Sequence, residues 1–216
     1  MTSLPRASDL AYNHLLDRIL TLQLPPGEPI NEQAIADEMG LSRIPIHEAV
    51  LRLAIDGFIV TMPRRGSRVT PLQLDDIRDM FEAREAIECG VAHIAARRAS
   101  NADLANLRRL IEAAEQTRES TDYDKFLRDD LAIHQFLVGM VRNSQLQAAA
   151  DRLLLHNQRL WRSYWSSQPV RTSTMISHSD LLLALEAGDS DGASRAMRQH
   201  IGASLDLLQS SLRSST

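Results

Sequence analysis

Residues 31–56 constrain the fold more than any other segment, because they read as two short helices joined by a tight corner. Asn31 can cap the first helix, and Gly40 supplies the permissive backbone that a helix-to-helix corner needs. Ser42 is a good N-cap for the second helix, and Pro45 falls in its first turn, where a missing N–H costs little. The pattern predicts a helix-turn-helix. The second helix is expected to bury an apolar stripe of Ile46, Val50, Leu51 and Leu53.

A basic hairpin is predicted directly after this helix pair. Residues 58–63 form a short β-type run, residues 64–68 are a turn rich in arginine, and residues 69–70 resume an extended pattern. Periodicity alone also fits an ordinary packed helical hairpin. A cation-tipped hairpin at this place favours a winged DNA-binding domain instead.

The candidate DNA contacts lie at the start of the second helix and in the hairpin. Ser42, Arg43 and His47 occupy the exposed N-terminal end of the helix, the part that meets bases and phosphates in such folds. Arginine suits two-pronged contacts to guanine and phosphate, although arginines also occur as a merely solvated surface. The net charge of −4 argues against a nonspecific nucleic-acid coat, so the prediction depends on local placement. The cations concerned are Arg43, Arg52, Arg64, Arg65 and Arg68.

The remainder of the chain shows no strand pattern and is predicted to be an all-α bundle of six helices. The predicted fold is therefore mainly α, with a winged helix-turn-helix domain over 1–71 and a helical domain over 72–216. An amphipathic helix is expected at 8–22. The bundle helices are expected at 74–99, 102–119, 122–142, 144–166, 172–187 and 190–212.

The sequence predicts a cytoplasmic location. No stretch approaches the length of a membrane span, and the first residues do not form a signal peptide. The single cysteine, Cys89, excludes an internal disulfide and fits a reducing compartment. A membrane partner is therefore not expected.

Four residues of the helical half could hold a metal ion. Asp130 and His134 stand four residues apart, on one side of a helix, and His178 and His200 each adjoin an apolar run on later helices. Three imidazoles and a carboxylate suit a divalent ion such as Zn²⁺ or Ni²⁺. The spacing alone is more typical of a capping or surface ion pair and of singly hydrogen-bonded histidines.

Two further residues are candidates for binding an effector. Arg84 could bind a carboxylate with both arms of its guanidinium, or it could instead pair with Glu88 one turn away. Asn157 could line a cavity with His156, or lie on a polar helix face.

These motifs together resemble a known family. Residues 40–53, Asp56–Ile59 and Arg64–Val69 are similar to the winged helix of GntR-type bacterial regulators. The helical half, with Asp-x-x-x-His and two later histidines, resembles the FCD effector domain of the FadR subfamily. Its six predicted helices suit the shorter, VanR-like branch.

The resemblance implies roles for individual residues. Ser42 and Arg43 match the family's DNA contacts, and Gly66 matches the wing glycine, which lets the backbone approach the minor groove. Two departures concern DNA specificity: His47 stands where a second arginine is usual, and Ile44 where threonine is usual. The family's metal ligands match Asp130, His134, His178 and His200.

The expected function is a ligand-responsive transcriptional regulator, with repression as the expected sign. A homodimer would bind double-stranded operator DNA, because two half-sites match a two-fold protein. The helical domain would hold a small carboxylate metabolite at a divalent metal and at Arg84. The alternatives are a metal-dependent enzyme acting on a small acid, and a repressor that senses the metal itself.

Overall fold

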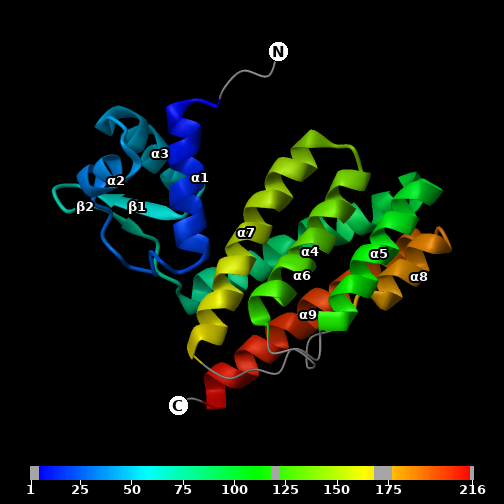
Figure 1. The fold of residues 1–216 in the computed structure, drawn as a ribbon. Coiled ribbons are helices and arrows are strands. Elements are labelled where there is room, and N and C mark those ends of the chain that lie inside the picture. Colours follow the sequence, from blue (N-terminus) through cyan, green and yellow to red (C-terminus); the bar gives the residue numbers. More distant parts are fainter. Residues whose placement is uncertain (1–4, 118–121, 168–176, 215–216) are drawn as a thin grey trace. The chain divides into compact units, whose positions relative to one another are not determined.

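The computed structural model describes residues 5–117, 122–167 and 177–214 and divides the chain into two compact units (Figure 1). The first unit spans Met1–Gln73 and the second Leu74–Thr216. Each unit has its own core, and each is described by itself below.

The N-terminal unit is a helix-turn-helix followed by a two-stranded wing. Its helix α1 packs against α3, and α3 in turn contacts α2 and β1. This arrangement confirms the winged helix-turn-helix predicted from residues 31–70. The elements are α1 (Ala7–Leu20), α2 (Glu32–Met39), α3 (Arg43–Ile55), β1 (Ile59–Met62) and β2 (Gly66–Val69).

The corner between α2 and α3 follows the predicted chemistry with two differences. The Asn31 side chain accepts a hydrogen bond from the Ala34 N–H at 3.1 Å, and Gly40 has a φ of 63°. Ser42 occupies the N-cap position, but its side chain makes no capping hydrogen bond. The prediction that Leu51 is buried was wrong: its side chain is 46% exposed, and Ala49 is buried instead. At about 100° per residue, Leu51 is turned away from the face that holds Val50.

The wing is an antiparallel hairpin that pairs Ile59 with Val69 and Met62 with Gly66. The N–H of Arg65 donates to the carbonyl of Met62 at 3.1 Å and closes the turn. Arg64 and Gly66 have φ of 62° and 75°, and this left-handed backbone is strained for arginine but not for glycine. The tip of the hairpin therefore presents two arginines on a tightly bent backbone.

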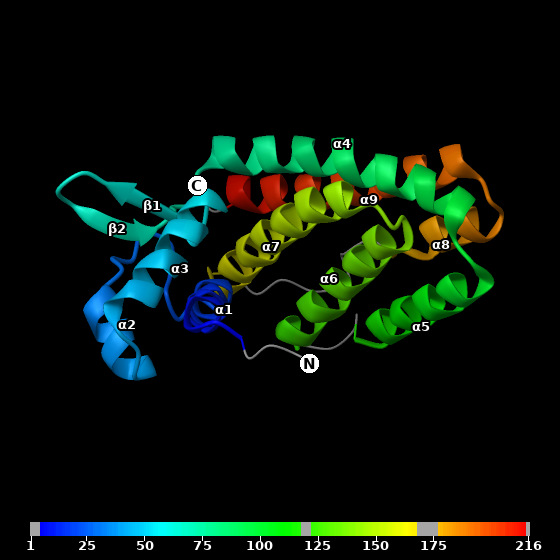
Figure 2. The ribbon, with the colours of Figure 1, turned by 90° about the horizontal axis from the view of Figure 1, so that it is seen from above.

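The C-terminal unit is all-helical in its described residues, as predicted. Helices α4 and α9 lie side by side and make the most extensive helix pair, while α6 packs against α5, α7 and α4 (Figures 1 and 2). Residues 172–176 of the predicted helix 172–187 lie outside the described residues, and the helix observed there begins at Ser179 and ends at Glu186. The helices are α4 (Leu74–Arg98), α5 (Asn101–Thr117), α6 (Tyr123–Met140), α7 (Ser144–Ser167), α8 (Ser179–Glu186) and α9 (Ser190–Ser214).

The core of this unit contains several buried charged and polar groups. Each needs a partner, because an isolated buried charge is strongly disfavoured. They cluster where α4, α6, α8 and α9 meet. No helix in the described part of the chain combines the length and apolarity needed to cross a membrane. The buried polar residues of the cluster are Arg84, Glu88, His134, His178 and His200.

Candidate functional sites

The start of α3 presents the predicted DNA-contacting residues at the surface. Ser42, Arg43 and His47 are all exposed, and Ile44 between them is 71% exposed. The His47 Nδ1 lies 3.1 Å from Glu32 Oε1, so this histidine contacts the helix before it. The exposed Ile44 side chain places an apolar group on the surface beside these polar residues.

Arg52 has a different environment from the other predicted DNA contacts. Its Nη1 donates to Asp9 Oδ1 at 2.7 Å, and its guanidinium lies 4.4 Å from the centre of the Tyr12 ring. The Tyr12 hydroxyl in turn donates to Asp56 at 2.7 Å. Arg52 therefore links α3 to α1. If Arg52 also contacted DNA, the same guanidinium would serve both the link and the contact.

The wing exposes Arg64, Arg65 and Gly66 at its tip, while Arg68 on β2 is half-buried. A side chain at Gly66 would meet no heavy atom within 4 Å. The glycine is therefore required by its positive φ, and not by close packing within the chain. The open space beside it is compatible with the close approach of a partner.

The four predicted metal ligands come together in the second unit. Asp130 and His134 are on α6, His178 is the residue before α8, and His200 is on α9; one ligand atom of each lies within 4.8 Å of the others. The Nε2 atoms of His178 and His200 lie 3.2 and 3.3 Å from that of His134. Asp130 Oδ1 is 3.8 Å from His134 Nε2 and 3.7 Å from His178 Nε2. Residues up to 70 positions apart therefore converge on one point.

The donor set fits a divalent ion of the zinc type. Three neutral imidazole nitrogens that face one another lack enough protons to satisfy each other, whereas a cation accepts all their lone pairs. A tetrahedral ion with bonds of about 2.0–2.1 Å separates its ligand atoms by about 3.3 Å, close to the imidazole separations found here. The Nδ1 of His200 is buried and has no hydrogen-bond partner among the described residues.

Behind the cluster lies the buried ion pair of Arg84 and Glu88, of which the sequence singled out only Arg84 as a site residue. Glu88 on α4 accepts from His134 Nδ1 at 2.5 Å with one oxygen, and from Arg84 Nε at 2.7 Å with the other. The side chains of Arg84 and Glu88 are each 2% exposed. The prediction that Arg84 binds an effector is untested, but the pair with Glu88 that sequence left open is present.

The charges of this network perturb one another. Burial alone would raise the pKa of Glu88, but Arg84 and His134 lower it to about 2. Burial lowers the pKa of His134, yet Glu88 and Asp130 outweigh it and the net shift is upward. Burial and the neighbouring His178 and His134 hold the pKa of His200 well below its usual value. At neutral pH His200 is therefore uncharged and can offer a lone pair.

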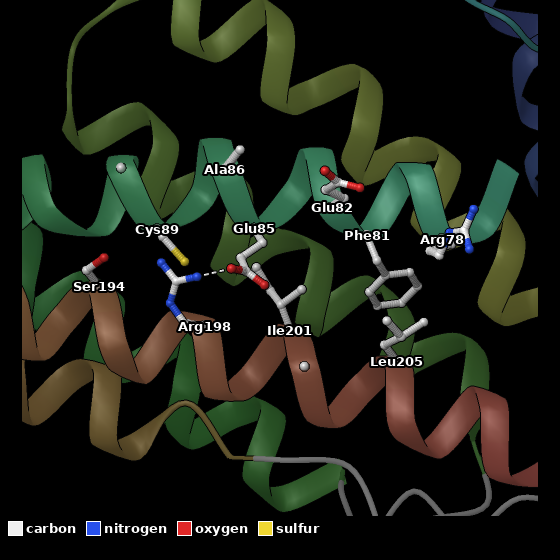
Figure 3. Close-up of a pocket in the computed structure, with 12 residues that line it drawn as sticks. Arg78, Phe81, Glu82, Glu85, Ala86, Cys89, Ser194, Arg198, Ile201 and Leu205 are labelled. Atoms are coloured by element: carbon white, nitrogen blue, oxygen red, sulfur yellow. Dashed lines mark hydrogen bonds and ion pairs between the residues drawn. The ribbon is translucent and has the colours of Figure 1, made fainter. Parts of the chain in front are cut away.

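Asn157, the other predicted effector residue, is buried on α7, and its Oδ1 has no hydrogen-bond partner among the described residues. A separate open groove of about 530 Å³ runs between α4 and α9, where Arg198 spans to Glu85 beside Phe81 and Ile201 (Figure 3). None of the four candidate metal ligands lines this groove. The metal cluster and the groove are thus different places in the bundle.

Comparison with protein families assigns both units. Residues 7–69 match the model of the gntR family of bacterial regulatory proteins, and residues 79–203 match that of the FCD domain. The two matches cover the winged helix and the helical bundle respectively.

Curated relatives with similar sequences are transcriptional regulators. The chain is 29% identical to the repressor RspR of Escherichia coli K12 over 199 residues, covering 88% of this chain and 83% of that protein. It is also 29% identical to a probable repressor of a D-xylose utilization operon from Paenarthrobacter nicotinovorans, covering 85% of this chain and 80% of that protein. These relatives are regulators and not enzymes.

Solved structures share the fold. The chain superimposes on E. coli McbR/YncC with a TM-score of 0.84 at 19% identity, covering 97% of this chain and all of the other. A GntR regulator from Rhodococcus sp. RHA1 gives a TM-score of 0.73 at 17% identity, covering 94% of this chain and 97% of the other. At these identities the likeness concerns the fold.

Proposed function

We infer that this chain, which belongs to the GntR family of bacterial regulatory proteins and carries an FCD domain, couples operator binding to the binding of a small carboxylate beside a metal ion. The chain is a DNA-binding transcriptional regulator, and repression is the expected sign because RspR and the D-xylose relative are described as repressors. The observation that carries the proposal is the convergence of Asp130 and three histidines inside the effector domain.

The DNA-binding role is assigned to the start of α3 and the tip of the wing. Ser42, Arg43 and His47 would enter the major groove, and Arg64, Arg65 and Gly66 would approach the neighbouring backbone or minor groove. Arg52 would contact a DNA phosphate with those guanidinium N–H groups that its hydrogen bond to Asp9 leaves available. A homodimer is expected, since a two-fold protein matches a pseudo-palindromic operator. Such a regulator would act in the cytoplasm.

Operator binding is tested by selecting a preferred sequence and measuring affinity by fluorescence anisotropy. Arg43→Ala is expected to lose about 1–3 kcal/mol on the preferred site if Arg43 contacts a base edge. Arg18→Ala is the matched control, because Arg18 pairs with Glu38 on the surface of the same unit at 2.8 Å. Equal affinity of the Arg43→Ala variant and wild type for the selected site would contradict this assignment.

In the effector domain, Asp130, His134, His178 and His200 would hold the ion, with Zn²⁺ or Ni²⁺ as the expected metals. When bound, the ion supplies a Lewis-acidic positive charge that attracts a carboxylate. Arg84 lies near enough for its charge to lower the pKa of Asp130 partly, against the dominant effect of burial. Its Nε donates to Glu88 and its guanidinium lies 5.4 Å from the centre of the Phe81 ring, and the two Nη groups are the proposed donors to the carboxylate. Asn157 is a further candidate contact, because its buried Oδ1 has no partner in the described structure.

Effector binding is tested by titrating small carboxylates calorimetrically into the metal-loaded protein. Arg84→Ala is expected to weaken carboxylate binding more than metal binding. Arg198→Ala is the control, because Arg198 on α9 pairs at the surface with Glu85 on α4, the helix that also carries Arg84. Coupling requires that the ligand change operator affinity, and that operator DNA change ligand affinity by the same factor. A responsive ligand that is uncharged, or an Arg84→Ala variant that binds it like wild type, would refute the carboxylate site.

A second candidate is a repressor for which the metal itself is the signal. The observation in its favour is that four candidate ligands converge, and four protein ligands would complete the shell of a tetrahedral zinc ion and leave no open position. Metal addition alone would then change operator affinity. A change that appears only when a carboxylate is also present favours the first proposal.

A further inference from the structure

We propose that Glu88 is the positioning residue of the metal centre: it holds His134 in the one tautomer and ring orientation that present Nε2 to the ion, and Arg84 holds Glu88 in place. This inference rests on the metal site in the proposed function. It concerns a residue on α4, whereas the four candidate ligands lie on α6, on α9 or directly before α8.

The direction of the hydrogen bond between His134 and Glu88 supports this role. The Glu88 carboxylate accepts from the Arg84 guanidinium with its other oxygen, and an ionised carboxylate has no proton to donate, so the 2.5 Å contact places a proton on His134 Nδ1. A histidine that ligates a metal is neutral, so with the proton on Nδ1 its lone pair lies on Nε2, the atom that faces His178 and His200. A metal-bound histidine commonly donates its other N–H to a carboxylate, which fixes the ring and strengthens the bound nitrogen as a donor.

The cost of burying the charges of Arg84 and Glu88 also supports this role. Arg84 and Glu88 are both buried, and a buried ion pair often stabilises a fold no more than apolar residues of the same size. The pair is therefore poorly explained as a source of stability alone. Glu88 uses its two oxygens on different partners, so fixing the carboxylate with Arg84 also fixes the imidazole. Through this link an anion that moves the Arg84 guanidinium would also disturb a metal ligand.

The test compares Glu88→Gln and Glu88→Ala with wild type, using Co²⁺ as the probe on the full-length protein after metal removal. We expect Glu88→Ala to bind Co²⁺ about 10–100-fold more weakly, the usual loss when a carboxylate behind a ligand is removed. Glu88→Gln keeps an oxygen that can accept from Nδ1–H but loses the charge, so an intermediate affinity is expected. Glu85→Gln is the matched control, because Glu85 is on the same helix and pairs with Arg198 at the surface.

A purely structural role would leave the metal site itself unchanged once it is filled. The visible absorption of the Co²⁺ forms is therefore recorded at saturation, where we expect altered band positions in the Glu88 variants and unchanged bands in the Glu85→Gln variant. If Glu88→Ala fails to fold, the near-isosteric Glu88→Gln variant carries the test. Wild-type affinity and an unchanged spectrum in the folded Glu88 variants would overturn this inference alone. A wild-type protein that binds no Co²⁺ would overturn the metal proposal with it.

Discussion

Removal of the metal is expected to lower the melting temperature of the helical unit by a predictable amount. An ion that binds only the native state stabilises it by about 2.7 kcal/mol when its free concentration is 100 times its dissociation constant. The unit spans residues 74–216, and a domain of this size shifts by roughly 2–4 °C per kcal/mol. The expected difference between metal-loaded and chelator-treated protein is therefore about 5–11 °C.

The assay is differential scanning calorimetry of wild type and of two histidine variants, each with Zn²⁺ and with chelator. His200→Ala removes one candidate ligand and is expected to lose most of the metal-dependent shift. His93→Ala removes a histidine of α4 that contacts Asp191 outside the cluster, and it should keep the full shift.

Two results would refute this reasoning. One is a melting temperature of wild type that does not respond to Zn²⁺ or Ni²⁺ at any concentration below that causing aggregation. The other is a metal-dependent shift of equal size in wild type and in the His200→Ala variant, since the ion would then bind elsewhere.

Two further predictions concern the N-terminal unit. Arg64→Gly should raise the stability of the unit by about 1 kcal/mol, because glycine adopts the positive φ without strain. Both Arg64→Gly and Arg65→Gly should lower the slope of log affinity for the operator against log salt concentration by about one unit, but Arg65→Gly should not stabilise the unit. A destabilised Arg64→Gly variant would show that the turn is not strained. Tyr12→Phe should cost about 1–2 kcal/mol, because the hydroxyl donates to Asp56. Burial, followed by the hydrogen bond to Asp56, raises the pKa of Tyr12 to about 12. The contribution of Tyr12 to the free energy of unfolding is therefore present below pH 10 and lost between about pH 10 and 12. Urea titrations across that range should show this loss in wild type but not in the Tyr12→Phe variant.

The sequence predicted the winged helix well because its signals are local. Each of Asn31, Gly40 and Pro45 acts on the backbone of its immediate neighbours. A basic turn between two β-type runs also has few other interpretations. The error at Leu51 arose because neighbouring apolar residues on a short helix compete for one buried face. Only packing against α1 decides between Ala49 and Leu51.

The metal cluster and the network behind it were predictable to different degrees. Asp130 and His134 share a helix, so their spacing could be read directly, but their meeting with His178 and His200 depends on how α6, α8 and α9 pack. The role of Glu88 could not be read at all, because an Arg and a Glu four residues apart look the same on a solvated face. What distinguishes the pair is burial and the contact with His134, 46 residues further along the chain.

The spread of the cluster over the chain bears on how long the folded protein survives. His134 and His200 are 66 residues apart, so the site exists only after α6 and the last helices have docked. Contacts that form after the folding barrier slow unfolding and leave the folding rate nearly unchanged. A bound ion would therefore act as a removable cross-link in a chain whose single cysteine allows no internal disulfide. The lifetime of the regulator against proteases, and hence its abundance, would then follow the metal supply of the cell.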